Sequence, residues 1–215
     1  SDRAAVPARD LASPGGADRA VSGRGVDAVI LAGGRATRMG GQVKALLEIE
    51  GRTILDRQRA VLAPLVDAIA VSGDAARFAA CGSPVVVDEL PGLGPLGGLA
   101  AALAWSRAPW LLAVAGDMPY LLAAAIERLL SHRADDVDAV APRVGGLPEP
   151  LFALYSPRCA EVLARRLAAG RYKASGLLTD EGLRVVWLPE DELRSIDPTL
   201  RCLHNVNSPP DVAPA

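Results

Sequence analysis

The sequence predicts an α/β fold: a Rossmann-like, open, mostly parallel sheet that carries helices on both faces. Short, largely uncharged apolar runs alternate along the chain with segments of helical periodicity. Such alternation is typical of parallel strands that are buried on both faces. With 215 residues, half of them hydrophobic, the chain is long enough for one domain with a substantial core. We therefore expect a single domain over residues 26–215.

Strands are expected where a short apolar run is rich in Val, Ile, Leu or Ala. The first of these runs ends in a glycine pair and the fourth ends in Gly116-Asp117. A further apolar segment at 45–49 is also expected to be extended, and residues 50–52 to form a turn. The seven main strands are predicted at residues 26–31, 67–71, 84–87, 110–115, 137–141, 151–154 and 184–188.

Helices are expected between these strands, and several have recognisable ends. Thr53 stands in an N-cap position with Asp56 three residues on, and Pro64 breaks the pattern that follows. Asp74 can cap a second helix, which Gly82 ends. The residues after 188 are expected to be irregular. The helices are predicted at residues 53–63, 74–80, 96–105, 121–131, 157–168 and 175–179.

Composition excludes several function classes. Residues 1–25 hold almost no large apolar side chain, so we expect a disordered tail and no secretory signal. No apolar run approaches the about 18–20 residues that cross a bilayer. The net charge of −2 and the lack of a basic stripe argue against a nucleic-acid partner. The three cysteines lack metal-ligand spacing and predict reduced thiols in a cytoplasmic protein.

A glycine-rich, basic stretch at residues 28–44 is the main functional candidate. An apolar strand ends in Gly33-Gly34, and Arg35, Arg38 and Lys44 follow. Backbone N–H groups in such a turn form an anion-binding nest. The spacing fits neither a P-loop nor a Rossmann fingerprint. A solvated loop is the alternative, but only two of the 23 basic residues are lysines, which favours a phosphate site that uses a compact charge at Lys44.

Polar residues follow other predicted strands, and the carboxyl ends of parallel strands line the ligand crevice of such sheets. Ser72, Asp88 and Asp117 all stand at such ends, together with Gly33. Asp117 follows a buried strand and can be a Mg²⁺ ligand, because Mg²⁺ needs one or two carboxylates plus substrate phosphates. Its alternative role is the N-cap of the next helix.

Asp88 and the Asn205-Val206-Asn207 segment have open interpretations. Asp88 can accept hydrogen bonds from a nucleotide base or be an ordinary turn residue. The amides of Asn205 and Asn207 point the same way if the segment is extended, which suits a second metal or a phosphate. A plain turn is the alternative, since Asn tolerates unusual backbone angles.

Several motifs, in order, resemble those of the molybdenum cofactor guanylyltransferases, the MobA-like nucleotidyltransferase family. The resemblance covers nearly all of the chain from residue 26 to residue 211. Five motifs carry it: the opening Leu31-Ala32-Gly33-Gly34 with Arg38-Met39-Gly40-Gly41 and Lys44, then Gly94-Pro95-Leu96-Gly97-Gly98, Gly116-Asp117-Met118-Pro119, Glu149-Pro150-Leu151 and Asn205-Val206-Asn207-Ser208-Pro209.

The resemblance implies a glycosyltransferase-A-like nucleotidyltransferase fold and a Mg²⁺-dependent reaction. The enzyme would transfer GMP from GTP to the phosphate of molybdopterin and release pyrophosphate. A GTP-binding accessory protein and molybdoenzyme chaperones are partners that it allows. Catalysis is expected from Lys44, Arg38 and Asp117, with Asp117 on the metal. The residues expected to bind substrates are Leu31, Ala32, Gly33, Gly34, Lys44, Ser72, Asp88, Asp117, Asn205 and Asn207.

Three residues depart from the family pattern. Val43 replaces an acidic residue before Lys44, Ser72 replaces an Asn, and Gly116 replaces a Cys, as in the related cytidylyltransferases. The alternatives are therefore a molybdopterin cytidylyltransferase, a sugar-phosphate nucleotidyltransferase, or a non-catalytic nucleotide-binding module.

Overall fold

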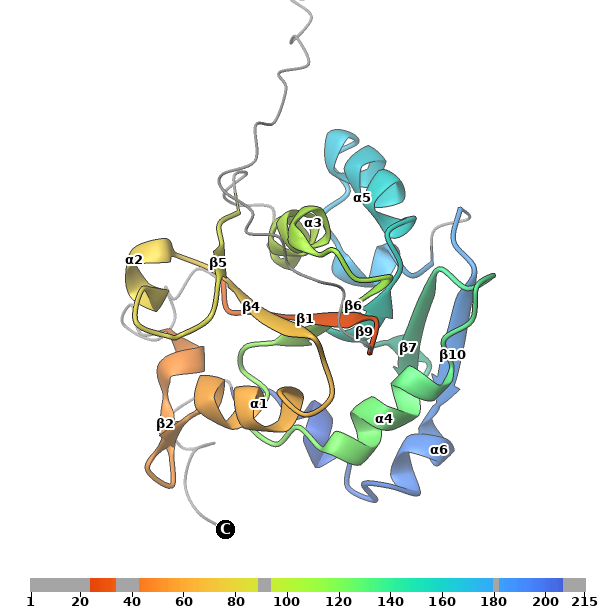
Figure 1. The fold of residues 1–215 in the computed structure, drawn as a ribbon. Coiled ribbons are helices and arrows are strands. Elements are labelled where there is room, and N and C mark those ends of the chain that lie inside the picture. Colours follow the sequence, from red (N-terminus) through yellow and green to blue (C-terminus); the bar gives the residue numbers. More distant parts are fainter. Residues whose placement is uncertain (1–23, 34–42, 89–93, 180–181, 207–215) are drawn as a thin grey trace, which may run out of the picture.

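The computed structural model describes residues 24–33, 43–88, 94–179 and 182–206 (Figure 1). Strand β1 (Val26–Leu31) lies in the interior of the sheet, and all six of its residues are buried. It pairs in parallel with β4 (Ala68–Ser72) on one side and β6 (Trp110–Ala115) on the other. The apolar composition of β1 and β6 follows from this central position, where helices cover both faces.

In the described part of the chain, the sheet has eight strands in the order β10-β7-β9-β6-β1-β4-β5, with β8 beside β7. Only β9 and β8 run antiparallel to their neighbours, so the predicted open, mostly parallel sheet is confirmed. The remaining strands are β5 (Val85–Val86), β7 (Ala139–Val144), β8 (Leu147–Pro148), β9 (Phe152–Tyr155) and β10 (Val185–Pro189).

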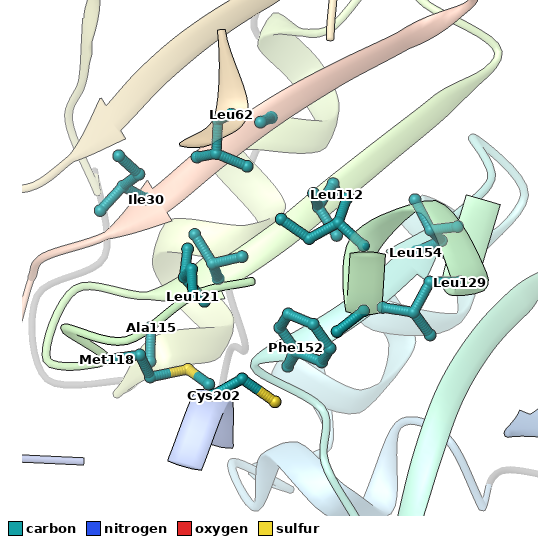
Figure 2. Close-up of a cluster of buried hydrophobic side chains, with 14 of the residues drawn as sticks. Ile30, Leu62, Leu112, Ala115, Met118, Leu121, Leu129, Phe152, Leu154 and Cys202 are labelled. Carbon is teal, nitrogen blue, oxygen red and sulfur yellow. The ribbon is translucent and has the colours of Figure 1, made fainter. Parts of the chain in front are cut away.

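Helices form a layer on each face of the sheet (Figure 1). Helices α3 (Pro95–Trp105) and α5 (Cys159–Ala168) cover one face, where Val29 and Leu31 pack. On the other face, Ala28 and Ile30 belong to a larger apolar cluster. Figure 2 shows part of that cluster, which joins the sheet to the second layer. This layer holds α1 (Ile54–Leu62), α4 (Ala123–Ser131) and α6 (Glu190–Arg194).

The predicted helix caps are confirmed in the first half of the chain. Thr53 accepts a hydrogen bond from the backbone N–H of Asp56 at 3.0 Å, and α1 ends at Leu62, before Pro64. Asp74 likewise accepts from the Arg77 N–H at 3.0 Å. The helix that it caps, α2 (Ala75–Phe78), is shorter than predicted.

The segment at 45–49, predicted to be extended, is mostly not a strand. It contains a 3₁₀ turn, η2 (Lys44–Leu46), and only then the short strand β2 (Glu48–Ile49), which pairs with β3 (Arg52–Thr53). The expected turn is present between β2 and β3, where Glu50 and Gly51 have φ values of 53° and 75°. Positive φ at both central residues is the two-residue hairpin geometry.

The prediction of an irregular region after residue 188 is wrong in part. Helix α6 and the 3₁₀ turn η4 (Arg201–Leu203) lie there. Leu193 of α6 is fully buried, and Glu192 accepts a hydrogen bond from Arg128 of α4 at 2.6 Å. A five-residue helix is unstable alone, so these tertiary contacts hold it. The expected helix at 175–179 is a 3₁₀ turn, η3 (Ala174–Gly176).

Two global expectations can be compared with the structure. All three cysteines carry free thiols, as predicted. Within the described residues, every helix is too short or too polar to cross a membrane. Most of the predicted tail, residues 1–23, lies outside the described part of the chain.

Candidate functional site

The carboxyl ends of β1, β4 and β6 lie side by side and bring several predicted site residues together. Leu31 is in register with Ser72 of β4 and with Ala115 of β6. Beyond the strands, the Ala32 N–H donates to the Ser72 carbonyl at 2.9 Å, and the Gly116 N–H donates to the Leu31 carbonyl at 3.0 Å. These bonds fix the backbone at the edge where open sheets bind ligands.

Lys44 and Asp117 meet at this edge. Lys44 Nζ donates to Asp117 Oδ2 at 2.9 Å, and the two side chains are 33% and 24% exposed. Lys44 begins η2, whose next residue, Ala45, is buried. Val43, in the place of the family's acidic residue, packs against the larger apolar cluster. The pair is thus held by buried neighbours while its charges stay accessible to a ligand.

Asp117 belongs to a tight turn after β6. The Met118 N–H donates to the Ala115 carbonyl at 3.3 Å, and the Asp117 carbonyl accepts from the Val206 N–H at 2.8 Å. The alternative role of Asp117 as a helix N-cap is wrong, because α4 begins at Ala123 and Leu122 is its N-cap residue. The Val206 bond places the exposed Asn205 in the segment that adjoins this turn.

Asp88 and Ser72 lie against the first turn of α3, which contains Gly97 and Gly98. A Cβ on Gly97 would overlap the Asp88 carboxylate, and a Cβ on Gly98 would overlap Ser72 Oγ. The two glycines therefore let the helix approach the ends of the sheet strands. Asp88 is half-buried, whereas Ser72 is only 2% exposed, so the Ser72 side chain lies beneath the helix and not at the surface.

Some predicted site residues cannot be placed. Gly34, Arg38 and Asn207 lie outside the described residues, and their roles stay predictions. Leu31, Ala32 and Gly33 are described, and Gly33 is exposed at the end of β1.

The Glu149-Pro150-Leu151 motif lies beside the same edge. The Leu151 carbonyl accepts from the Ala115 N–H at 2.8 Å, and the Pro150 carbonyl accepts from the Tyr155 hydroxyl at 2.7 Å. Burial raises the pKa of Glu149 above its ordinary value. These contacts tie the motif to the base of the Asp117 turn.

Sequence reasoning missed one residue at the site, Gln58 of α1. Its side chain is fully buried and donates to the Ala115 carbonyl at 2.7 Å and to the Met118 carbonyl at 2.9 Å. The sequence does contain a sign of this role. Gln58 lies four residues after Ile54 and four before Leu62, where the helical period predicts an apolar side chain and not an amide.

The donor set at this edge is compatible with a metal that is shared with a substrate. In the described ranges, no three His, Cys, Asp or Glu side chains are grouped so that they could hold a metal alone. Asp117 supplies one accessible carboxylate. One carboxylate completed by phosphate oxygens and water is an arrangement that Mg²⁺ commonly adopts.

Comparisons with known proteins identify the family of this chain. The family model described as "MobA-like NTP transferase domain" matches residues 28–185. A molybdenum cofactor guanylyltransferase from Rhodopseudomonas palustris is 38% identical, over 87% of this chain and 91% of the relative. Another, from Acidiphilium cryptum, is 40% identical, over 77% of this chain and 85% of the relative.

Solved structures share the fold. The molybdopterin-guanine dinucleotide biosynthesis protein A of Archaeoglobus fulgidus is 26% identical, with a TM-score of 0.72 and coverage of 86% of this chain and 94% of that one. The 2-C-methyl-D-erythritol 4-phosphate cytidylyltransferase of Thermus thermophilus has a TM-score of 0.62 at 15% identity, covering 86% and 94%, and shows a likeness of fold alone. The chain is a nucleotidyltransferase that belongs to the MobA-like NTP transferase family.

Proposed function

We propose that the protein transfers GMP from GTP to the terminal phosphate of molybdopterin, which forms the guanine dinucleotide cofactor and releases pyrophosphate. The observation that carries this proposal is the ion pair of Lys44 Nζ and Asp117 Oδ2, 2.9 Å apart, at the sheet edge where β1 and β6 end. The relatives named molybdenum cofactor guanylyltransferase support the choice of substrates, because they match over most of the chain.

In the proposed reaction, a phosphate oxygen of molybdopterin attacks the α-phosphorus of GTP. The new P–O bond forms as the bond from that phosphorus to the α,β-bridging oxygen breaks, and pyrophosphate leaves with this oxygen and its electron pair. Such transfers depend on positioning and on neutralisation of charge. Lys44 would donate hydrogen bonds to triphosphate oxygens, and the Gly33 N–H at the end of β1 would help to bind them.

Asp117 is the residue that we expect to hold Mg²⁺. When bound, Mg²⁺ neutralises charge on phosphate oxygens and helps to align them. Binding would need a small rearrangement of the pair, in which Lys44 turns from Asp117 towards the triphosphate. The partial exposure of both side chains allows this exchange of partners.

Two other described residues fit substrate contacts on either side of this pair. Asp88, beside the first turn of α3, would accept hydrogen bonds from the guanosine. A guanine edge presents N–H donors, which a carboxylate can accept. Asn205 adjoins the Asp117 turn through the Val206 bond and would face the pterin substrate.

Release of pyrophosphate tests the proposal. The protein would be incubated with molybdopterin, Mg²⁺ and each of GTP, CTP, ATP and UTP. We expect release with GTP. Release of pyrophosphate with CTP alone would instead show that the protein is a cytidylyltransferase. Gly116, in place of a Cys, is the feature that it shares with the related cytidylyltransferases. Binding of GTP without release from any of the four would identify a nucleotide-binding module.

A further inference from the structure

Gln58 is an unusual residue for its surroundings. It lies on the face of α1 that also carries Ile54, Leu55 and Leu62, and all four side chains are buried. An amide among apolar side chains is costly unless its polar atoms find hydrogen-bond partners. Gln58 finds two of them, and both are backbone carbonyls of the Asp117 turn.

The geometry of these bonds fixes the orientation of the amide. Nε2 lies 2.7 Å from the Ala115 oxygen and 2.9 Å from the Met118 oxygen, and its two hydrogens match two acceptors. The reverse orientation would direct Oε1 at both carbonyls. Oε1 itself is buried without a hydrogen-bond partner in the described part of the chain. The amide nitrogen therefore supplies hydrogen bonds to both carbonyls of the turn, and the amide oxygen is left without one.

The two carbonyls bracket Gly116 and Asp117. Without Gln58, the two ends of the turn would be joined by the long Met118 N–H to Ala115 carbonyl bond of 3.3 Å, while Gly116 and Asp117 would keep their backbone bonds to Leu31 and Val206. Figure 2 shows Ala115 and Met118 close together within the larger apolar cluster, to which Leu55 and Leu62 of α1 also belong. A link from α1 to both ends of the turn would restrict the backbone of Asp117 and, through it, the direction of the carboxylate.

We propose that Gln58 is a positioning residue, which clamps the Ala115–Met118 turn so that the Asp117 carboxylate keeps its place opposite Lys44. The effect on turnover rests on the proposed function, whereas the effect on the turn does not. Gln58 acts only through Asp117 and contacts neither reacting group.

Two variants separate this role from simple packing. Gln58→Met keeps an unbranched side chain of similar length but removes both donors. Gln58→Glu keeps the shape, directs a carboxylate at two carbonyls when ionised, and regains one donor when protonated. Leu62→Val is the matched control, because Leu62 is buried on the same helix face one turn later and the substitution removes packing without touching a hydrogen bond.

Amide hydrogen exchange measures the turn directly. In Gln58→Met we expect the Met118 amide to exchange about tenfold faster than in wild type, after correction for global stability, while Val140 in β7 keeps its rate. Leu62→Val should leave the ratio of these two rates unchanged. An unchanged Met118 rate in Gln58→Met would overturn the proposal.

Kinetics supply the second measurement. We expect Gln58→Met to lower kcat for guanylyl transfer about tenfold with little change in KM for GTP, in folded enzyme well below its melting temperature. Gln58→Glu should gain activity relative to Gln58→Met as the pH falls, because protonation restores one donor. A loosened turn with unchanged kcat would refute the positioning role, as would a Gln58→Glu enzyme that is no more active than Gln58→Met at any pH.

The two proposals can fail separately. A wild-type protein that transfers no guanylyl group would overturn the proposed function, and the exchange rates would still decide whether Gln58 clamps the turn. An active wild type with an unchanged turn in Gln58→Met would overturn the clamp alone.

Discussion

Lys44 Nζ lies 2.9 Å from Asp117 Oδ2, although 73 positions separate the two residues in the chain. Lys44 follows the glycine-rich segment after β1, and Asp117 follows β6. The parallel pairing of these adjacent strands brings both residues to one edge. A partly exposed ion pair contributes little to stability, about 1 kcal/mol at most. We therefore propose that the pair serves the binding of a charged ligand and not the stability of the fold.

Removal of the side chain of either Lys44 or Asp117 should impair catalysis and leave the fold intact. We expect Asp117→Ala and Lys44→Ala to lower kcat/KM on the order of 100-fold or more, because in the proposed reaction Lys44 contacts the triphosphate and Asp117 holds Mg²⁺. Lys44→Arg should restore little activity, since a planar guanidinium does not replace a compact ammonium group. Initial rates of pyrophosphate release and melting curves are the measurements.

Glu161→Ala is the control for these variants. It breaks an exposed ion pair with Arg165, at 3.0 Å on α5, and should keep wild-type activity. Near-normal turnover in Asp117→Ala, or a large loss in Glu161→Ala, would contradict the assignment of the site.

Substitution of Gly97 by alanine should not stabilise the protein and should weaken GTP binding. Gly→Ala inside an exposed helix normally stabilises a protein by about 0.5–1 kcal/mol. Here the new Cβ would overlap the Asp88 carboxylate, so we expect no gain in melting temperature and a higher KM for GTP. Ala104→Gly, at an exposed position of the same helix, controls for helix propensity and should leave the KM unchanged. A Gly97→Ala enzyme that is more stable than wild type and has a normal KM for GTP would show that Asp88 does not contribute to nucleotide binding.

The three thiols should differ in reactivity. Burial raises the pKa of Cys159 to about 12, helped by the negative charge of Asp138. Burial and the neighbouring Asp197 raise the pKa of Cys202 to about 12 as well. At pH 8 about one in ten thousand of such thiols is ionised, and the thiolate is the reactive form.

Half-buried Cys81 is thus the residue that a disulfide reagent should modify first. We expect one fast equivalent per chain under native conditions, which Cys81→Ser removes, and three after denaturation. Two or more fast equivalents in the native wild type would show that Cys159 or Cys202 is accessible.

The contact between α4 and α6 should make stability depend on pH. The hydrogen bond from Arg128, and next that from His132, lowers the pKa of Glu192 below its ordinary value of 4.5. A lowered folded-state pKa stabilises the protein above the unfolded-state pKa, and this stabilisation is lost as the pH falls through the folded-state value.

Glu192→Gln should therefore melt a few degrees below wild type at pH 7, and the difference should shrink below about pH 4.5. Glu127→Gln, an exposed substitution on α4, serves as the control. A melting difference that stays constant from pH 7 to pH 3.5 would show that the ionised carboxylate of Glu192 does not stabilise the fold.

The central strands could be predicted from the sequence because local composition determines them. The predicted bounds of β1 and β6 equal the observed ones, since both strands are buried on both faces and consist almost wholly of apolar residues. Thr53 and Asp74 begin their helices as predicted, because an N-cap bond depends on residues only three positions apart.

Other elements depend on distant contacts that a local pattern does not contain. Helix α6 is held by Arg128 and by burial of Leu193. Strand β8 is a two-residue strand that follows Gly145 and Gly146, with φ values of 56° and 80°, and this hairpin is absent from the strands predicted from the sequence. At the site, the strand-end rule located Asp117, Ser72 and Gly33. It could not show that α1 would place Gln58 beneath the Asp117 turn.

Transfer of a labelled phosphate tests directly whether the protein transfers GMP from GTP to molybdopterin. The protein would be incubated with molybdopterin, Mg²⁺ and GTP labelled at either the α- or the γ-phosphate, with Asp117→Ala as the inactive control. We expect the α-label to enter a molybdopterin product and the γ-label to leave in pyrophosphate. A γ-label in the pterin product, or no α-label in it while a CTP α-label is transferred, would contradict guanylyl transfer by this protein.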